Sequence, residues 1–377
     1  MEHYVKPVST GDSPERRSGD CHDRHLDSIE IGHLALRNRL VMAPMTRSRA
    51  APDGTPGPLA AVYYAQRAGL GLLISEGTQP SDAGQGYIFT PGIYTDRHVE
   101  GWRAVTSAVH EAGSRLFIQL MHVGRVSHPD NTPGHALGVA PSAVAPKDQM
   151  FTLEGMKPIP EPRALTTDEI ARTVEDFRHA ARRAIEAGAD GVEIHGANGY
   201  LVQQFFAPNA NLRTDRYGGG IENRARFAVE VARAIAEEIG GERTGIRLSP
   251  GATLGSLDEG PEAPDLYRHL VGELDKLGLA YIHVMHLGNE ALLADIRRLW
   301  SRALIVNRPG RAVQDVGSDI AAGRADLESY GQLVLSTPDF PARLKSGAAM
   351  NPADKATFYG GGAEGYTGYP VLSGEAA

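Results

Sequence analysis

Short apolar runs alternate with longer amphipathic stretches from about residue 26 almost to the end of the chain. The apolar runs suit buried parallel strands, and they lie at 40–44, 71–77, 115–120, 191–195, 244–249, 281–285, 303–307 and 326–330. Helices are expected between them, near 59–68, 98–112, 167–187, 222–239, 262–277, 289–300, 312–322 and 338–346. Eight strands that alternate with helices predict an α/β fold, and the count of eight favours a closed (β/α)₈ barrel over an open sheet.

The clearest helical pattern spans residues 167–187. Its apolar positions step by three or four residues, as in an amphipathic helix that buries one face; they are Ile170, Val174, Phe177, Ala181 and Ile185. Thr166 and Glu169 have the spacing of a capping box at its start, and Gly188 fits its C-terminal cap. Both ends of this helix are therefore predicted as well as its buried face.

The chain divides into a tail and one domain. Residues 1–25 are polar and without periodicity, so a flexible tail is expected there. Residues 26–377 are expected to form the single (β/α)₈ TIM barrel, with an N-terminal hairpin within 26–39. Hydrophobic residues make up 41% of the chain and charged residues 22%, which is enough apolar material for a sizeable core.

Charge and cysteine content narrow the classes of function. The net charge of −8 argues against nucleic acid or an anionic membrane as the main partner, and no apolar run is long enough to span a bilayer. Cys21 is the one cysteine of the sequence, which excludes an internal disulfide and a thiolate zinc site. We expect a cytoplasmic protein that acts on a small molecule, and the sequence leaves its oligomeric state open.

Polar side chains gather at the predicted carboxyl ends of the strands, where a barrel places its chemistry. These ends read APMTR, SEGT, QLMHVGR, IHGANGY and RLSP. Within them, His195 and Asn198 could both donate hydrogen bonds to one carbonyl oxygen and stabilise an enolate. Tyr200 carries a phenolic proton close by and is a candidate acid toward the neighbouring carbon. No convincing metal-ligand spacing is present, so no metal is expected.

The same motifs resemble a known family. LVMAPMTRSRA, LISEGTQPS, FIQLMHVGRVSHP, VEIHGANGYLVQQFFAPNANLRTDRYGGGIENR, GIRLSP and TFYGGGAEGYTGYP occur in the order found in the Old Yellow Enzyme family. The resemblance covers the chain from about Leu26 to Pro370. It implies one (β/α)₈ barrel that binds FMN, takes NADPH or NADH as reductant, and reduces the C=C bond of an α,β-unsaturated carbonyl compound.

The resemblance also assigns roles to particular residues. It implies that the flavin ring contacts Pro44, Met45, Thr46, Gly77, Gln119 and Arg247, with the Arg247 charge near the pyrimidine edge. It implies that His195 and Asn198 hold the substrate carbonyl and that Tyr200 donates the proton. Tyr87 and Tyr359 would shape the substrate pocket.

The turns that would hold the FMN phosphate depart from the family pattern. The turn after the seventh strand contains Arg308 and Pro309, and proline lacks an N–H to donate. After the eighth strand, Gly331 is followed by Gln332 where the family has an arginine, and Glu328 replaces an apolar residue.

Three functions remain open on these grounds. Arg308 could replace the lost arginine, so that FMN binds, with retained or reduced affinity, at Arg308, Gly331 and Gln332. Flavin could instead be lost, and the His195, Asn198 and Tyr200 pocket would then perform non-redox enone chemistry, an isomerisation or a cyclisation. The third alternative is a binding barrel without catalysis.

Overall fold

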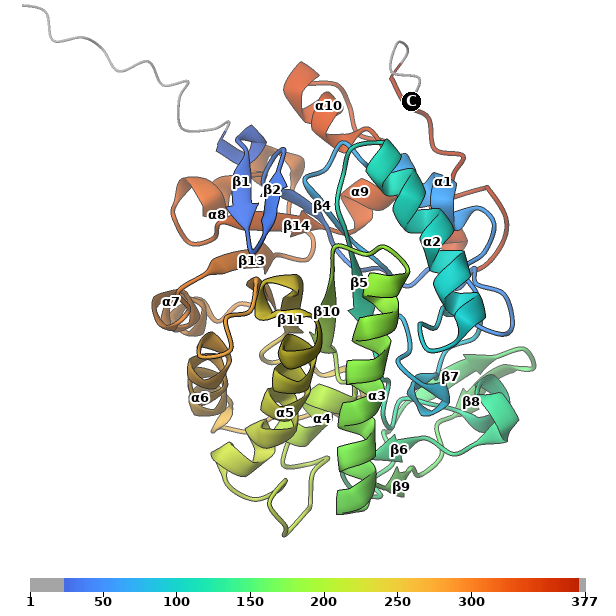
Figure 1. Cartoon of the computed structure of the whole chain (residues 1–377), viewed down its shortest axis with the longest axis vertical. Helices are drawn as coiled ribbons and strands as arrows, with labels where there is room; N and C mark the ends of the chain where they lie inside the picture. Colours follow the sequence, from blue (N-terminus) through green and yellow to red (C-terminus); the bar gives the residue numbers. More distant parts are fainter. Residues whose placement is uncertain (1–23, 373–377) are drawn as a thin grey trace, which may run out of the picture.

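Eight parallel strands close into a barrel in the computed structural model, which describes residues 24–372 (Figure 1). In barrel order the strands are β3 (Leu40–Met42), β4 (Leu72–Ile74), β5 (Leu116–Leu120), β10 (Gly191–Gly196), β11 (Thr244–Leu248), β12 (Tyr281–Met285), β13 (Ala303–Asn307) and β14 (Leu327–Tyr330). They coincide with the eight predicted apolar runs. The predicted (β/α)₈ barrel is therefore confirmed.

Helices form a ring outside the strands (Figure 1). They are α1 (Ala60–Ala65), α2 (Asp96–Glu111), α3 (Thr167–Glu186), α4 (Leu201–Phe206), α5 (Ile221–Ile239), α6 (Ala263–Asp275), α7 (Glu290–Leu299), α8 (Ser318–Ala321), α9 (Gln332–Ser336) and α10 (Phe340–Ser346). At the start of α3, Thr166 and Glu169 form the predicted capping box, and Gly188 follows its end at φ +88°. Within the described residues, no helix is both long and apolar enough to cross a membrane.

One prediction about the helices is wrong in detail. The stretch 312–322 forms a 3₁₀ turn, Val313–Asp315, followed by the short helix α8 rather than one continuous helix. Gly317 separates the two with φ +84°, a left-handed conformation that interrupts helical hydrogen bonding.

At the amino-terminal ends of its strands, the barrel interior is apolar and is closed by the predicted hairpin, β1 (Ile29–Ile31) and β2 (Leu34–Leu36). Side chains from the hairpin and from six strands form one buried cluster, including Ile31, Leu36, Phe117, Tyr281 and Ile305. The predicted tail over 1–25 lies outside the described residues, except for Arg24 and His25 in a 3₁₀ turn, Arg24–Leu26. With its amino-terminal mouth plugged, the barrel opens for ligands at the carboxyl ends of the strands.

An excursion between β5 and α3 was not predicted. It contains the parallel pair β6 (Val139–Ala140) and β9 (Arg163–Ala164), and the antiparallel pair β7 (Gln149–Thr152) and β8 (Gly155–Pro158). In Figure 1 it lies at the opposite end of the barrel from the hairpin. Met150 of β7 packs with Tyr200 and Met121, so the excursion covers one side of the open end.

Candidate active site

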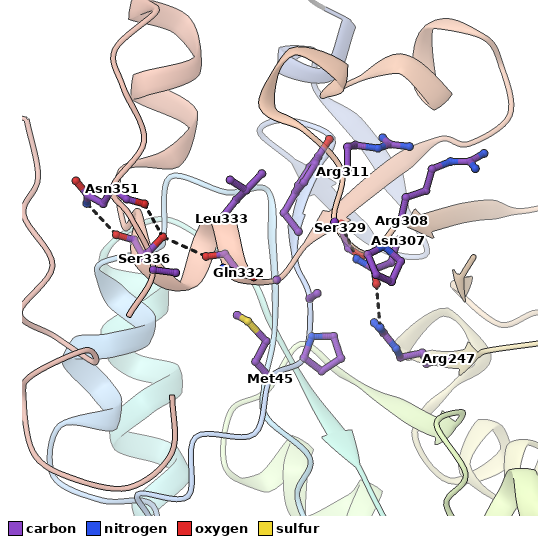
Figure 2. A pocket seen from close by; sticks show the side chains of 17 residues that line it. Met45, Arg247, Asn307, Arg308, Arg311, Ser329, Gln332, Leu333, Ser336 and Asn351 are labelled. Atoms are coloured by element: carbon purple, nitrogen blue, oxygen red, sulfur yellow. Dashed lines mark hydrogen bonds between the residues drawn. The ribbon is translucent and has the colours of Figure 1, made fainter. Parts of the chain in front are cut away.

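Two adjoining hollows open at the carboxyl ends of the strands. The smaller, of about 330 Å³, is lined by Pro44, Met45, Thr46, Gly77, Gln119, Met121, His195, Asn198, Tyr200, Gly331, Gln332, Leu335, Phe358 and Tyr359. The larger, of about 500 Å³, also has Pro44, Met45, Gly331 and Gln332 in its wall, so the two hollows meet there. Figure 2 shows the larger hollow between Met45 and Gln332 on one side and Asn307 and Arg308 on the other.

His195 and Asn198 present unoccupied polar atoms to the smaller hollow. The Ala197 N–H donates to His195 Nδ1 over 3.3 Å, so the ring proton belongs on Nε2. Burial, reinforced by the charge of Arg247, holds the pKa of His195 well below its usual range. Asn198 has φ +53°, its N–H donates to Ser249 Oγ at 2.7 Å, and its buried Oδ1 has no partner. A neutral imidazole donor and a free carboxamide therefore share one wall.

Tyr200 lies beside this pair. Its ring meets the His195 ring edge to face, with centroids 4.8 Å apart, and its hydroxyl is 3.0 Å from the hydroxyl of Tyr87. Burial raises the pKa of Tyr200 well above its ordinary value, so the phenol keeps its proton. Tyr200 can therefore act as a proton donor, with Tyr87 as its hydrogen-bond partner.

A buried polar network lies under the floor of both hollows. Glu193 accepts from Gln119 Nε2 and from His283 Nδ1, each over 2.8 Å. Arg247 donates to His283 Nε2 at 2.9 Å and to Asn307 Oδ1 at 3.2 Å, while its buried Nε has no partner. Burial lowers the pKa of His283 to about 4, so the ring is neutral. It donates to a carboxylate with one nitrogen and accepts from a guanidinium with the other. The network fixes the amide of Gln119 and leaves the Nε–H of Arg247 without a partner among the described residues.

The loop after β3 is held by a second buried carboxylate. Glu76 accepts from the N–H of Arg47 at 2.9 Å, and burial raises its pKa to about 7. Arg47 reaches on to the carboxyl-terminal segment, where it donates to the carbonyls of Phe358 and Gly365 at 2.9 and 2.8 Å. These bonds join the two segments that carry Thr46 and Tyr359, both of which line the smaller hollow.

Two of the arginines that line the larger hollow, Arg308 and Arg311, pair with carboxylates of the chain itself. Arg308 donates to Asp319 and Glu290 at 2.6–3.2 Å and to His286 Nδ1 at 3.0 Å. Those five bonds use all five N–H groups of a guanidinium. Arg311 forms ion pairs with Asp319 and Glu328. In Figure 2 both arginines point away from Gln332 and Met45.

Glu328 does not face the hollow. Its carboxylate accepts from the N–H groups of Gly317 and Asp319 at 2.8 and 2.7 Å and from the Tyr330 hydroxyl. The Glu328 carboxylate therefore does not point at a phosphate in the hollow and cannot repel it directly. Glu328 acts on the hollow through Arg311, whose charge it offsets.

The structure brings nearly all predicted site residues together. Those named by the sequence line one or both hollows, except Tyr87, which lies behind Tyr200 and touches the site through it. The residues missed are Met121, Leu335 and Phe358 in the smaller hollow, and Ala43, Asn307, Arg311, Ser329, Leu333, Ser336, Asn351 and Ala353 in the larger. Asn307 and Ser329 stand at strand ends and could have been found by the same rule as the others.

A flavin fits the smaller hollow and the part of the larger hollow next to it. Arg247 supplies a buried cation with an unpaired Nε, and a flavin ring carries electron-rich oxygens and nitrogens on its pyrimidine edge. Gln119 donates its NH₂ to Glu193, which leaves its carbonyl oxygen for an imide N–H. The far part of the larger hollow fits a phosphate poorly, because Pro309 lacks an N–H and Arg308 has none to spare.

Fold and site together define an oxidoreductase barrel with a pocket for an activated carbonyl compound. The family model described as NADH:flavin oxidoreductase / NADH oxidase matches residues 27–351, so the chain belongs to that family, the Old Yellow Enzymes. It is 44% identical to 12-oxophytodienoate reductase 1 of Oryza sativa subsp. japonica over 362 residues, covering 92% of this chain and 93% of that protein. It is 40% identical to 12-oxophytodienoate reductase 2 of Arabidopsis thaliana over 365 residues, covering 93% and 96%.

Solved structures agree with this assignment. Morphinone reductase in complex with tetrahydroNAD superposes with a TM-score of 0.89 at 44% identity, covering 93% of this chain and 98% of that chain. The Old Yellow Enzyme homologue from Zymomonas mobilis also gives 0.89, at 36% identity and with coverage of 92% and 99%. The similarity is therefore spread over the whole barrel.

Proposed function

We propose that this protein reduces the C=C bond of a small α,β-unsaturated carbonyl compound, with FMN as cofactor and NADPH or NADH as reductant. The observation that carries the proposal is the neutral His195 donor beside the free amide of Asn198 and the protonated Tyr200, all in one hollow. Bound FMN would supply the hydride to the carbon β to the carbonyl. The substrate classes in the names of the plant relatives and of morphinone reductase support an enone-type substrate.

The residues of the chain account for the other half of the reaction. His195 Nε2–H and the Asn198 amide donate to the carbonyl oxygen, where negative charge develops as the β carbon receives hydride. Tyr200 then delivers its proton to the carbon next to the carbonyl, and its hydroxyl is replenished through Tyr87. The product gains one hydride and one proton, so the saturated carbonyl compound is balanced without further reactants.

Turnover with 2-cyclohexen-1-one and NADPH or NADH tests the proposal. His195→Ala should lower kcat by about 10²-fold or more, the usual effect of losing one oxyanion donor. Tyr200→Phe should also lower kcat, whereas Tyr217→Phe removes another buried hydroxyl, bonded to Glu230 outside both hollows, and should leave kcat unchanged. Undiminished turnover in His195→Ala would overturn the assignment.

Purified protein should be yellow or should become so on incubation with flavin. Protein that binds no flavin yet converts the enone through Tyr200 would instead point to isomerisation or cyclisation. Since the sequence has a single cysteine, we propose a reducing compartment, the cytoplasm, as its location.

A further inference from the structure

The charged groups around the far end of the larger hollow cancel one another. Arg308, Arg311 and Arg324 face the carboxylates of Asp319, Glu290 and Glu328. Asp319 is fully buried and binds all three arginines. The nearby His286 adds no charge, since burial lowers its pKa. Three positive and three negative charges leave this cluster neutral.

Apart from Arg247, which stands at the end next to the smaller hollow, the rest of the polar wall is neutral. Among the described residues, the larger hollow has no carboxylate in its lining, and its neutral polar groups are Asn307, Ser329, Gln332, Ser336 and Asn351. The NH₂ groups of Asn307 and Asn351 already donate to carbonyls of the chain. The Gln332 amide and the spare lone pairs of the hydroxyl and amide oxygens can still exchange hydrogen bonds with hydroxyls, which both donate and accept. The hollow adjoins the smaller one, so a polyol chain attached to a ring in the smaller hollow would extend into it.

Resting on the proposed function, we propose that this hollow binds the polyol side chain of a flavin and does not select for its terminal phosphate. The protein therefore binds riboflavin and FMN with similar affinity, because Glu290, Asp319 and Glu328 occupy the arginines that a phosphate would need. These three carboxylates act through the arginines and are positioning residues that set cofactor specificity.

Affinity for the two flavins distinguishes this arrangement from a phosphate site. One hydrogen bond between a guanidinium and a phosphate changes affinity by about 10- to 100-fold. A hollow with two such bonds would favour FMN over riboflavin by at least about 100-fold. The neutral cluster predicts a ratio of riboflavin Kd to FMN Kd below about five.

The experiment is a titration of flavin-stripped protein with riboflavin and with FMN, followed by flavin fluorescence. Glu290→Ala removes two acceptors from Arg308 and leaves the cluster with one positive charge. It should tighten FMN by about tenfold and leave riboflavin unchanged. Glu262→Ala is the matched control, since Glu262 also stands at a helix start, is 64% exposed against 58% for Glu290, and pairs with Arg224 outside both hollows.

Each outcome decides between the two proposals. If FMN binds more than about fivefold more tightly than riboflavin, flavin binding stands and the specificity inference is wrong. The inference also fails if Glu290→Ala tightens both flavins equally or neither. If neither flavin binds, the proposed function is wrong, and the inference falls with it. Similar affinities in the wild type, with a gain for FMN alone in Glu290→Ala, support it.

Discussion

Replacing Glu193 by glutamine should destabilise the barrel and lower its affinity for flavin. Glu193 is fully buried and accepts from two donors, Gln119 Nε2 and His283 Nδ1. Glutamine has the same shape but turns one acceptor oxygen into an NH₂ group. If that group faces Gln119, the Gln119 amide must turn over to accept from it, and its carbonyl oxygen no longer faces the hollow. If it faces His283, it meets the Nδ1–H. Reversing the His283 proton would only move the conflict to Arg247, which donates to His283 Nε2.

The magnitude follows from these contacts. Loss of a buried hydrogen bond to a charged group costs about 1.5–3 kcal/mol, and leaving a buried charge without its partner costs about 3–5 kcal/mol. Because Arg247 keeps its bond to Asn307, we expect the cost of a lost hydrogen bond rather than that of an unpaired charge, about 2–3 kcal/mol in the free energy of unfolding.

The assay is chemical or thermal unfolding of both proteins without flavin. Glu238→Gln serves as control, because Glu238 pairs with Arg178 and Arg182 at the surface at 3.9 and 3.5 Å and should change stability by less than about 1 kcal/mol. Flavin affinity should fall in Glu193→Gln, since the Gln119 amide loses its anchor. A stability within about 1 kcal/mol of the wild type would refute the view that Glu193 holds this network together.

Three further predictions concern other parts of the chain. The pKa of Glu76 is raised from 4.5 to about 7 in the fold, so its contribution to stability is present below about pH 4.5 and is lost as pH rises through 7. Relative to Glu76→Gln, the free energy of unfolding of the wild type should fall by on the order of 3 kcal/mol between pH 4.5 and pH 7. Parallel pH profiles of the two proteins would contradict this. Gln332→Arg combined with Pro309→Gly should lower the Kd for FMN by about 10- to 100-fold. Stoichiometric FMN in the purified wild type, with no lower Kd in the double variant, would show that the larger hollow already binds the phosphate. Thr166→Ala should cost about 1 kcal/mol in unfolding free energy by removing the capping box, whereas Thr167→Ala should have a smaller effect, and equal losses would count against the cap.

The barrel could be predicted because its signals are local. Each strand is a short apolar run, and the Thr166–Glu169 capping box and Gly188 mark both ends of α3 within a few residues. The excursion after β5 was missed because its strands are two to four residues long and Gln149–Thr152 is half exposed. The helices α4 and α9 were missed for the same reason, since five or six residues carry too little periodicity.

At the site, the identity of the residues could be predicted better than the direction in which their side chains point. Alternation along β14 would have helped, because Ser329 faces the barrel interior and bonds His283, while Glu328 and Tyr330 on either side face outward. The occupation of Arg308 depends on Glu290 and Asp319, which are 18 and 11 residues away and belong to different helices. No local pattern identifies such a pairing, and it decides what the larger hollow can bind.

The fate of the hydride tests the central proposal most directly. The protein, supplied with flavin and a nicotinamide reductant deuterated at the transferable position, is allowed to convert 2-cyclohexen-1-one. Hydride transfer through flavin should give cyclohexanone with deuterium at the carbon β to the carbonyl and none at the α carbon, where Tyr200 delivers a proton. Formation should be much slower in His195→Ala. An isomerised or cyclised product without deuterium would contradict hydride transfer.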